Sequence, residues 1–248
     1  MYTKQDLLAH LSETGVDPNG TLMVHLSYKA IGEVEGRGDA VLDALSEYMR
    51  PGLLVLPSHT WANVGTDNPV MDALYTPSCV GKLTELFRGR PGVCRALHPT
   101  HSLAALGADA EEFVSGEENI NTPCGKGGAY YKLWERGAQI LLIGVNFERN
   151  TYIHGIEEWD GAQGTISPEK TDFYVINRQG SRLYTPQYRH CAPLGSQTFC
   201  KLEPFAYERG ILSFARFGDA TARLIGAREL RDLAAEFLRA DPKYLSRY

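Results

Sequence analysis

Residues 139–157 read QILLIGVNFERNTYIHGIE, and this stretch gives the clearest structural signal in the chain. Its apolar run Ile140–Ile143 predicts a strand over 139–145 that is buried on both faces, as in a parallel sheet. A polar loop follows, and Asn150 and Thr151 are typical helix-start residues for a helix over 152–159. Ligands of open α/β sheets collect at the carboxyl ends of the strands. The loop after this strand is therefore the first place to expect a functional site.

The chain before this stretch predicts a strand–helix–strand unit. Thr21–His25 and Leu53–Leu56 are short apolar strands, and the segment 39–49 between them has helical spacing of its apolar residues. Pro51 and Gly52 end that helix. Two strands joined by a helix of this length form a parallel pair.

The remaining segments predict helices and an antiparallel hairpin. We expect helices over 3–13 (with Thr3 as N-cap), 80–88, 129–135, 218–225 and 227–239, a short helix opened by Asp109, and strands over 102–106, 172–177 and 182–185, the last two joined by a turn at 177–180. The fold class is therefore α/β with α+β character late in the chain: a mixed, partly parallel sheet flanked by helices. No linker divides the chain, so we expect a single domain over residues 1–248.

Composition excludes several classes of function. The 25 Lys and Arg against 30 Asp and Glu give a net charge of −5, whereas nucleic-acid-binding proteins show a basic patch. The number of cysteines is odd and no two of them form a CxxC pair, which indicates free thiols in a reducing compartment. These cysteines are Cys79, Cys94, Cys124, Cys191 and Cys200. No apolar run approaches the ~18 residues that span a bilayer. We expect a cytoplasmic protein that binds neither nucleic acid nor membranes.

Candidate chemistry lies on the helix after the central strand. His154 and Glu157 are three residues apart and share a helix face. A carboxylate there can hold one imidazole nitrogen and leave the other free as a base. Thr151, one turn earlier, can donate to an oxyanion or act as a plain N-cap. A surface helix with an incidental His/Glu pair, or half of a metal site, has the same spacing, so the pattern alone leaves these interpretations open.

The segment resembles the signature of the aminoglycoside 3-N-acetyltransferase family, in which a strand and a Gly-rich loop precede Asn-x-Thr-x-x-His-x-x-Glu. Here that string is Asn150, Thr151, His154 and Glu157. Four further segments resemble family motifs in the same order: Val24–Ser27 followed by Gly32 and Gly36, Leu54–Thr60, Arg95 with His98–Ser102, and Thr122–Gly125 leading to Leu133. Each motif is loose alone, but five in order are specific, and together they span residues 4–240.

The resemblance implies a fold and a reaction. Family members transfer an acetyl group from acetyl-CoA directly to the 3-amino group of a 2-deoxystreptamine aminoglycoside, without a covalent acyl-enzyme. An amine that is protonated at neutral pH becomes a nucleophile only when a base removes its proton. By position, His154 matches the family's general base and Glu157 its orienting carboxylate, and Thr151 is the candidate for oxyanion stabilisation. No metal is expected.

The resemblance also implies contacts to the cosubstrate, acetyl-CoA. Ser27, Tyr28 and Lys29 follow the first strand and offer backbone N–H groups and one cation. A second family contact region matches His98, Pro99 and Ser102. The residue types leave other interpretations open, because Lys29 could be a solvated surface charge and at least one of the histidines beside Pro99 is expected to be structural. His25 ends an apolar strand and is expected to be a buried histidine rather than a catalyst.

An aminoglycoside is a polycation, so carboxylates should face it. The expected acceptor-binding residues are Asp67, Glu158, Asp160 and His190. However, Arg189 beside His190 places a cation where some relatives that modify aminoglycosides place an acid. The acceptor could therefore be a different small amine.

Two other classes of function remain as alternatives. One is a metal-dependent hydrolase built on His154, Glu157, His190 and His98. The other is a non-catalytic acyl-CoA-binding protein, against which the intact His154 and Glu157 pair argues. The partners expected are coenzyme A and a small amine, and the sequence is compatible with an oligomer.

Overall fold

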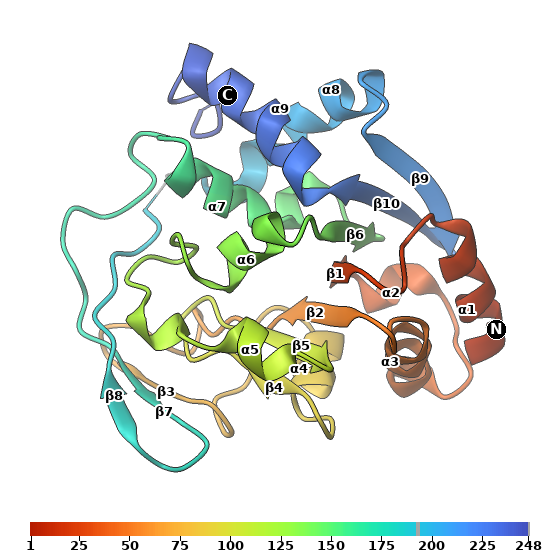
Figure 1. The fold of residues 1–248 in the computed structure, drawn as a ribbon, viewed down its shortest axis with the longest axis horizontal. Coiled ribbons are helices and arrows are strands. Elements are labelled where there is room, and N and C mark those ends of the chain that lie inside the picture. Colours follow the sequence, from red (N-terminus) through yellow and green to blue (C-terminus); the bar gives the residue numbers. More distant parts are fainter. Residues whose placement is uncertain (192–193, 248) are drawn as a thin grey trace.

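Two β-sheets organise the chain, as a computed structural model shows for residues 1–191 and 194–247 (Figure 1). In that part of the chain the larger sheet has seven strands, in the order β4 (Cys94–Arg95), β5 (Leu103–Gly107), β2 (Leu53–Pro57), β1 (Thr21–Leu26), β6 (Gln139–Ile143), β10 (Ala220–Gly226) and β9 (Leu212–Phe217). β1 pairs in parallel with both β2 and β6, and the other pairs are antiparallel. The predicted strand–helix–strand unit and the mixed, partly parallel sheet are confirmed.

Helices cover both faces of this sheet, because its central strands are apolar on both sides. One face packs against α1 (Lys4–Glu13), α2 (Tyr28–Ile31), α3 (Arg37–Tyr48) and α4 (Lys82–Arg88). The other packs against α5 (Ala110–Val114), α6 (Ala129–Glu135), α7 (Tyr152–Trp159), α8 (Glu203–Glu208) and α9 (Ala227–Ala240). Along β1, Leu22 and Val24 belong to the first core and Met23 to the second, as the alternation of a strand requires.

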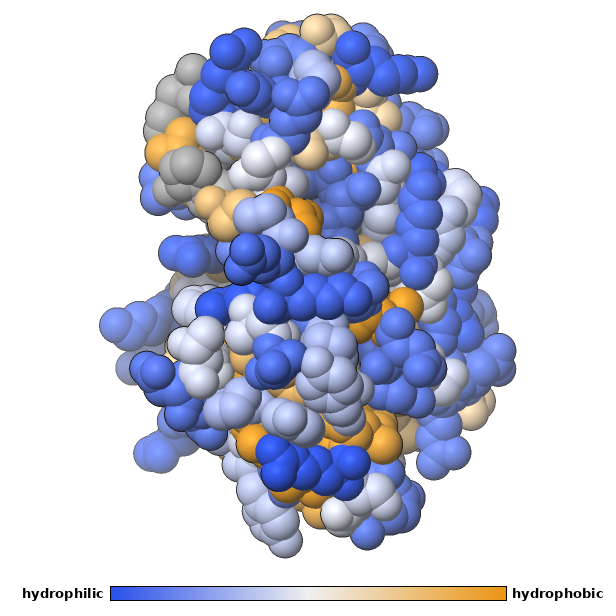
Figure 2. All heavy atoms as spheres, turned by 90° about the vertical axis from the view of Figure 1, so that its left-hand side faces the viewer, coloured by the Kyte–Doolittle hydropathy of each residue, from blue (hydrophilic) through white to orange (hydrophobic). Residues whose placement is uncertain are grey.

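The smaller sheet consists of β3 (Val70–Asp72), β7 (Tyr174–Ile176) and β8 (Arg182–Tyr184). It has its own small core, which includes Met71 and Phe173. The predicted hairpin is confirmed as β7 and β8, and the Gly180 N–H donates to the Asn177 carbonyl in the turn. The surface shown in Figure 2 is mostly hydrophilic and is notched at mid-height, between the C-terminal helices above and the small sheet below.

One predicted helix is wrong. Residues 218–225, expected to be helical, form the turn and most of β10, which pairs antiparallel with both β6 and β9. Alanine, arginine and leucine favour helices locally, but pairing with the central strand overrides that preference. The buried side chains of Ala220, Ala222 and Leu224 recur every second residue, as in a strand.

The other predicted helices are confirmed with small shifts at their ends. α1 begins at the predicted N-cap, where Thr3 and Asp6 form a reciprocal capping box. α6 and α7 begin and end where the sequence indicated. Short 3-10 helices at Glu117–Asn119, Phe147–Arg149 and Gly195–Leu202 were not predicted. Within the described residues, no helix has the length and apolar character to cross a membrane.

Gly144 sets the turn that leads from β6 into the site loop, and its substitution should destabilise the fold. Its φ is +65°, and an added Cβ would overlap the Cβ of Ala30. We expect Gly144→Ala to cost about 2–4 kcal/mol, from overpacking and a left-handed backbone together. Gly180→Ala is the matched control, because Gly180 has φ +81° but open space around it, so only the backbone cost of about 1–2 kcal/mol applies. Urea unfolding of both variants checks this, and equal losses would contradict the steric argument.

Candidate active site

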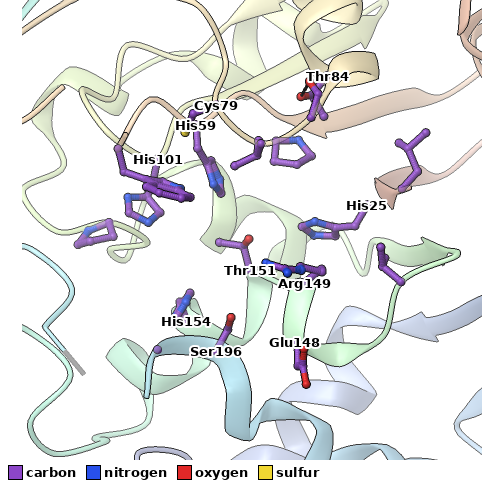
Figure 3. A pocket seen from close by; sticks show the side chains of 18 of the residues that line it. His25, His59, Cys79, Thr84, His101, Glu148, Arg149, Thr151, His154 and Ser196 are labelled. Carbon is purple, nitrogen blue, oxygen red and sulfur yellow. Dashed lines mark hydrogen bonds between the residues drawn. The ribbon is translucent and has the colours of Figure 1, made fainter. Parts of the chain in front are cut away.

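A cavity of about 950 Å³ opens at the carboxyl ends of the parallel strands β1, β2 and β6. His25 and Ser27 come from the end of β1, His59 follows β2, and Thr151 and His154 follow β6. Figure 3 shows His59, His101, Thr151 and His154 around one open space, with His25 on the side of the view opposite His154. The sequence-based expectation of a site after the central strand therefore coincides with this cavity.

His154 and Glu157 form a pair on α7 at the wall of this cavity. The distance from His154 Nδ1 to Glu157 Oε2 is 2.8 Å. Glu157 is buried, with 1% of its side chain exposed, whereas His154 keeps 14% exposed. Burial raises the pKa of the Glu157 carboxyl, although the hydrogen bond from His154 opposes this shift. Because Glu157 holds Nδ1, Nε2 is the ring nitrogen of His154 that is left for the cavity.

Thr151 occupies the N-cap position of α7, but its side chain makes no capping hydrogen bond. It lines the cavity instead. Its hydroxyl interacts with the buried phenol of Tyr130, whose oxygen lies 2.7 Å from His59 Nε2. The plain N-cap interpretation of Thr151 is therefore not supported by a side-chain bond, and a polar network links Thr151 to His59.

Three further histidines line the cavity near His154. Burial and the neighbouring imidazoles hold the pKa values of His59, His101 and His190 well below the ordinary histidine value, so these rings are neutral at neutral pH. The ring centroids of His190 and His154 are 4.2 Å apart, and those of His190 and His101 are 5.0 Å apart. His190 was predicted as a site residue, whereas no role was predicted for His59 or His101.

Glu158 lies behind His190 rather than in the cavity wall, so its predicted direct contact with the acceptor is not supported. Its Oε1 is 3.1 Å from His190 Nε2 and accepts a hydrogen bond from the Cys124 N–H at 2.9 Å. Burial raises the pKa of the Glu158 carboxyl to about 7. Since Glu158 binds Nε2 of His190, this carboxyl orients the ring that faces the cavity.

The other predicted acceptor-binding carboxylates lie elsewhere. Asp160 ends α7 and pairs with Arg231 at 2.8 and 3.0 Å. Asp67 is exposed on the loop between β2 and β3 and does not line the cavity. Both were predicted for their negative charge, and neither lines the cavity.

The predicted cosubstrate residues divide into two groups. Ser27, Tyr28 and Lys29 line the cavity, at the start of α2. His98, Pro99 and Ser102 are buried and do not line it.

The second group has structural roles. His98 Nδ1 accepts hydrogen bonds from the backbone N–H groups of Thr100 and His101, and the Ser102 hydroxyl donates to the Ala96 carbonyl. These residues shape the loop that presents His101 and do not face a ligand. His25 is buried as expected, and burial lowers its pKa to about 3, but its Nε2 has no hydrogen-bond partner among the described residues.

Positive charge exceeds negative charge along the cavity. The cationic side chains that line it are those of Lys29, Lys82, Arg149 and Arg189, and the carboxylates are those of Glu148 and Glu157.

In the described part of the chain, no three His, Cys, Asp or Glu side chains are grouped to hold a metal ion. The cysteines in that part are free thiols, and Cys79 lines the cavity. The arrangement offers an oriented base beside an anion-attracting channel.

Comparisons with known proteins agree with this architecture. The sequence model described as aminoglycoside 3-N-acetyltransferase matches residues 23–239. Aminoglycoside N(3)-acetyltransferase IV of Salmonella sp is 28% identical over 247 residues, which cover 97% of this chain and 89% of that relative.

Solved structures share the fold. A mutant of aminoglycoside acetyltransferase AAC(3)-IVa, in complex with a gentamicin, gives a TM-score of 0.86 at 25% identity and covers 98% of this chain and 91% of its own. AAC-IIIb, solved as a binary complex with CoASH, gives a TM-score of 0.84 at 21% identity and covers 96% of each chain. The residues matched by the family model include the strands and loops that build the cavity. The chain therefore belongs to the aminoglycoside 3-N-acetyltransferase family, a family of acetyl-transferring enzymes.

Proposed function

We propose that this protein transfers the acetyl group of acetyl-CoA to an amine, with His154 as the general base. The acceptor that family membership suggests is the 3-amino group of a 2-deoxystreptamine aminoglycoside, and a different small amine is the alternative. The observation that carries this proposal is the His154–Glu157 pair in the wall of the cavity. The buried Glu157 carboxylate orients the ring, and Nε2 is left to receive a proton.

The residues suggest the following sequence of steps. The acceptor ammonium group first loses one proton to solvent. His154 Nε2 then removes a second proton from the neutral amine as the amine nitrogen attacks the thioester carbonyl carbon. A tetrahedral oxyanion forms, and the Thr151 hydroxyl can donate a hydrogen bond to it. The carbon–sulfur bond then breaks, and the imidazolium returns a proton to the thiolate. The products are the N-acetylated amine and free CoA, and the carboxylate of Glu157 stabilises the transient imidazolium.

The charge of the cavity supports an anionic cosubstrate. Coenzyme A carries a pyrophosphate and a 3′-phosphate, and Lys29 and Arg149 lie near the ends of β1 and β6, where phosphates of nucleotides bind in α/β sheets. A structural neighbour of this chain was solved with CoASH bound. We infer that Ser27, Tyr28, Lys29 and Arg149 form the cosubstrate end of the cavity.

Lys29 provides a test of this cosubstrate end. It is exposed, so its contribution to binding a phosphate is about 0.2–1 kcal/mol, and we expect Lys29→Ala to raise the Kd of CoA by up to about fivefold, less at high salt. Lys126→Ala is the control, because Lys126 is also exposed but lies outside the cavity. Isothermal titration with CoA at two salt concentrations measures the effect, and equal Kd values for the two variants would remove Lys29 from the cosubstrate site.

The proposal as a whole is tested by thiol release from acetyl-CoA with a panel of amines that includes gentamicin and apramycin. Turnover of an aminoglycoside supports it. If CoA binds but no aminoglycoside is acetylated, the assignment of the acceptor is wrong and the assignment of the cosubstrate stands. If CoA does not bind, both fail.

A further inference from the structure

Arg189 lines the cavity on the side where His190 packs beside His154. It precedes His190, whose ring centroid is 4.2 Å from that of His154. Its backbone is fixed by two hydrogen bonds to Ser167, one from the Arg189 N–H to Ser167 Oγ and one from the Ser167 N–H to the Arg189 carbonyl, each 2.8 Å long. This end of the cavity is also lined by Thr165.

The guanidinium of Arg189 has no internal counter-charge. Within residues 1–191 and 194–247, it forms no salt bridge and no side-chain hydrogen bond, although it is half-buried. By contrast Arg223 and Arg231, which are also half-buried, each pair with a carboxylate at 2.8 Å. A cation that is partly removed from water and unpaired favours the binding of an anion.

The same end of the cavity has no carboxylate that could receive a second positive charge. Of the two carboxylates in the described lining, Glu157 is committed to His154, and Glu148 belongs to the loop after β6, beside Arg149. The carboxylates expected to bind the acceptor, Asp67 and Asp160, lie outside the cavity. An acceptor with several ammonium groups would therefore meet Arg189 and neutral imidazoles, and like charges placed together oppose binding.

We propose that Arg189 determines acceptor specificity by binding an anionic group, so that the preferred acceptor is a small amine that carries a carboxylate or a phosphonate rather than a polycationic aminoglycoside. This inference rests on the proposed acetyl transfer and favours the alternative acceptor, a different small amine, over the aminoglycoside. The reacting amine lies at His154, and the anionic group lies at the guanidinium, on the side of His190. His190, oriented by Glu158, separates the two subsites.

The test uses pairs of amines that differ in one charge. β-Alanine is compared with β-alaninamide, 3-aminopropylphosphonate with its diethyl ester, and apramycin serves as the polycation. Each is assayed by thiol release with wild type, Arg189→Gln, Arg189→Glu and the control Arg50→Glu, since Arg50 is exposed and lies outside the cavity. The Kd of CoA is measured for every variant by titration calorimetry.

We expect wild type to favour the charged member of a pair by about tenfold to a hundredfold in kcat/KM, as a charge-assisted hydrogen bond allows. Arg189→Gln should erase this preference, and Arg189→Glu should reverse it and raise kcat/KM for apramycin by at least about tenfold. The Kd of CoA should stay within about twofold in all variants, since the inference places no cosubstrate contact at Arg189. The carboxylate and phosphonate arms show which anion is preferred.

Several results would overturn the inference. If wild type acetylates apramycin better than the anionic amines and Arg189→Glu does not improve it, Arg189 does not select the acceptor, while acetyl transfer itself stands. If Arg189→Gln weakens CoA binding, the residue belongs to the cosubstrate. If CoA binds but no anionic amine is acetylated, the assigned acceptor class is wrong. If CoA does not bind to wild type, the proposed function fails first.

Discussion

Replacing His154 with alanine should lower kcat by about a hundredfold to ten-thousandfold, the range that a positioned general base contributes. The acceptor amine is protonated at neutral pH, and His154 is a cavity-lining imidazole held at Nδ1 by the Glu157 carboxylate at 2.8 Å. His59, His101 and His190 cannot replace it, because their lowered pKa values make them weaker bases. Stopped-flow or steady-state thiol release from acetyl-CoA measures the loss.

The control for this variant separates chemistry from folding and binding. The His154 ring packs edge-on against Phe199, with ring centroids 4.8 Å apart, so the alanine variant loses some packing. We expect a small decrease in Tm and an unchanged Kd for CoA. Activity that recovers as pH rises would identify lost proton transfer as the cause, because the free amine then forms without a base. A loss of less than about tenfold would show that another group removes the proton.

The regular part of the fold could be predicted from local sequence, and its C-terminal edge could not. In β6 and α7, the apolar residues that predict a strand and a helix are also the residues that the fold buries, so local pattern and tertiary packing indicate the same structure. Residues 218–225 contain alanine, leucine and arginine, which favour a helix. In the fold most of them form β10, because they pair with β6, which is distant in the sequence. β9 was missed for the same reason, since its burial pattern has few inward residues and its structure depends on β10.

The candidate site was predictable where its residues lie close together in the chain. His154 and Glu157 share one helical turn, so their contact follows from spacing alone. His59 and His101 were missed as lining residues because their proximity depends on β2 and β5 being antiparallel neighbours, which brings the end of one strand beside the start of the other. Asp160 pairs with Arg231 on α9 and does not line the cavity, and nothing local in the sequence indicates that pairing.

Exchanging Glu157 for glutamine should reduce kcat by about a hundredfold to ten-thousandfold while leaving the cavity intact. The amide NH₂ can donate to His154 Nδ1, which places the ring proton on Nε2. That tautomer has no lone pair facing the acceptor, so it cannot act as a base. In the double variant Glu157→Gln/His154→Ala the loss should equal that of His154→Ala alone, since the two residues act as a unit. Additive losses would mean that Glu157 acts on something other than His154.

The same Glu157→Gln exchange should stabilise the protein as it inactivates it. Burial raises the folded-state pKa of this carboxyl above its unfolded value, and Oε1 has no hydrogen-bond partner in the described residues. A raised carboxyl pKa means that ionised Glu157 costs stability above the folded-state pKa, and that this cost vanishes as pH falls below the ordinary glutamate value of about 4.3. The amide carries no charge, so the Tm advantage of Glu157→Gln over wild type should be larger at pH 8 than at pH 5. Differential scanning calorimetry at the two pH values decides this. A variant that is less stable than wild type at pH 8 would show that the ion pair with His154 outweighs the cost of burying the carboxylate. The ionised Glu157 would then stabilise the folded protein rather than destabilise it.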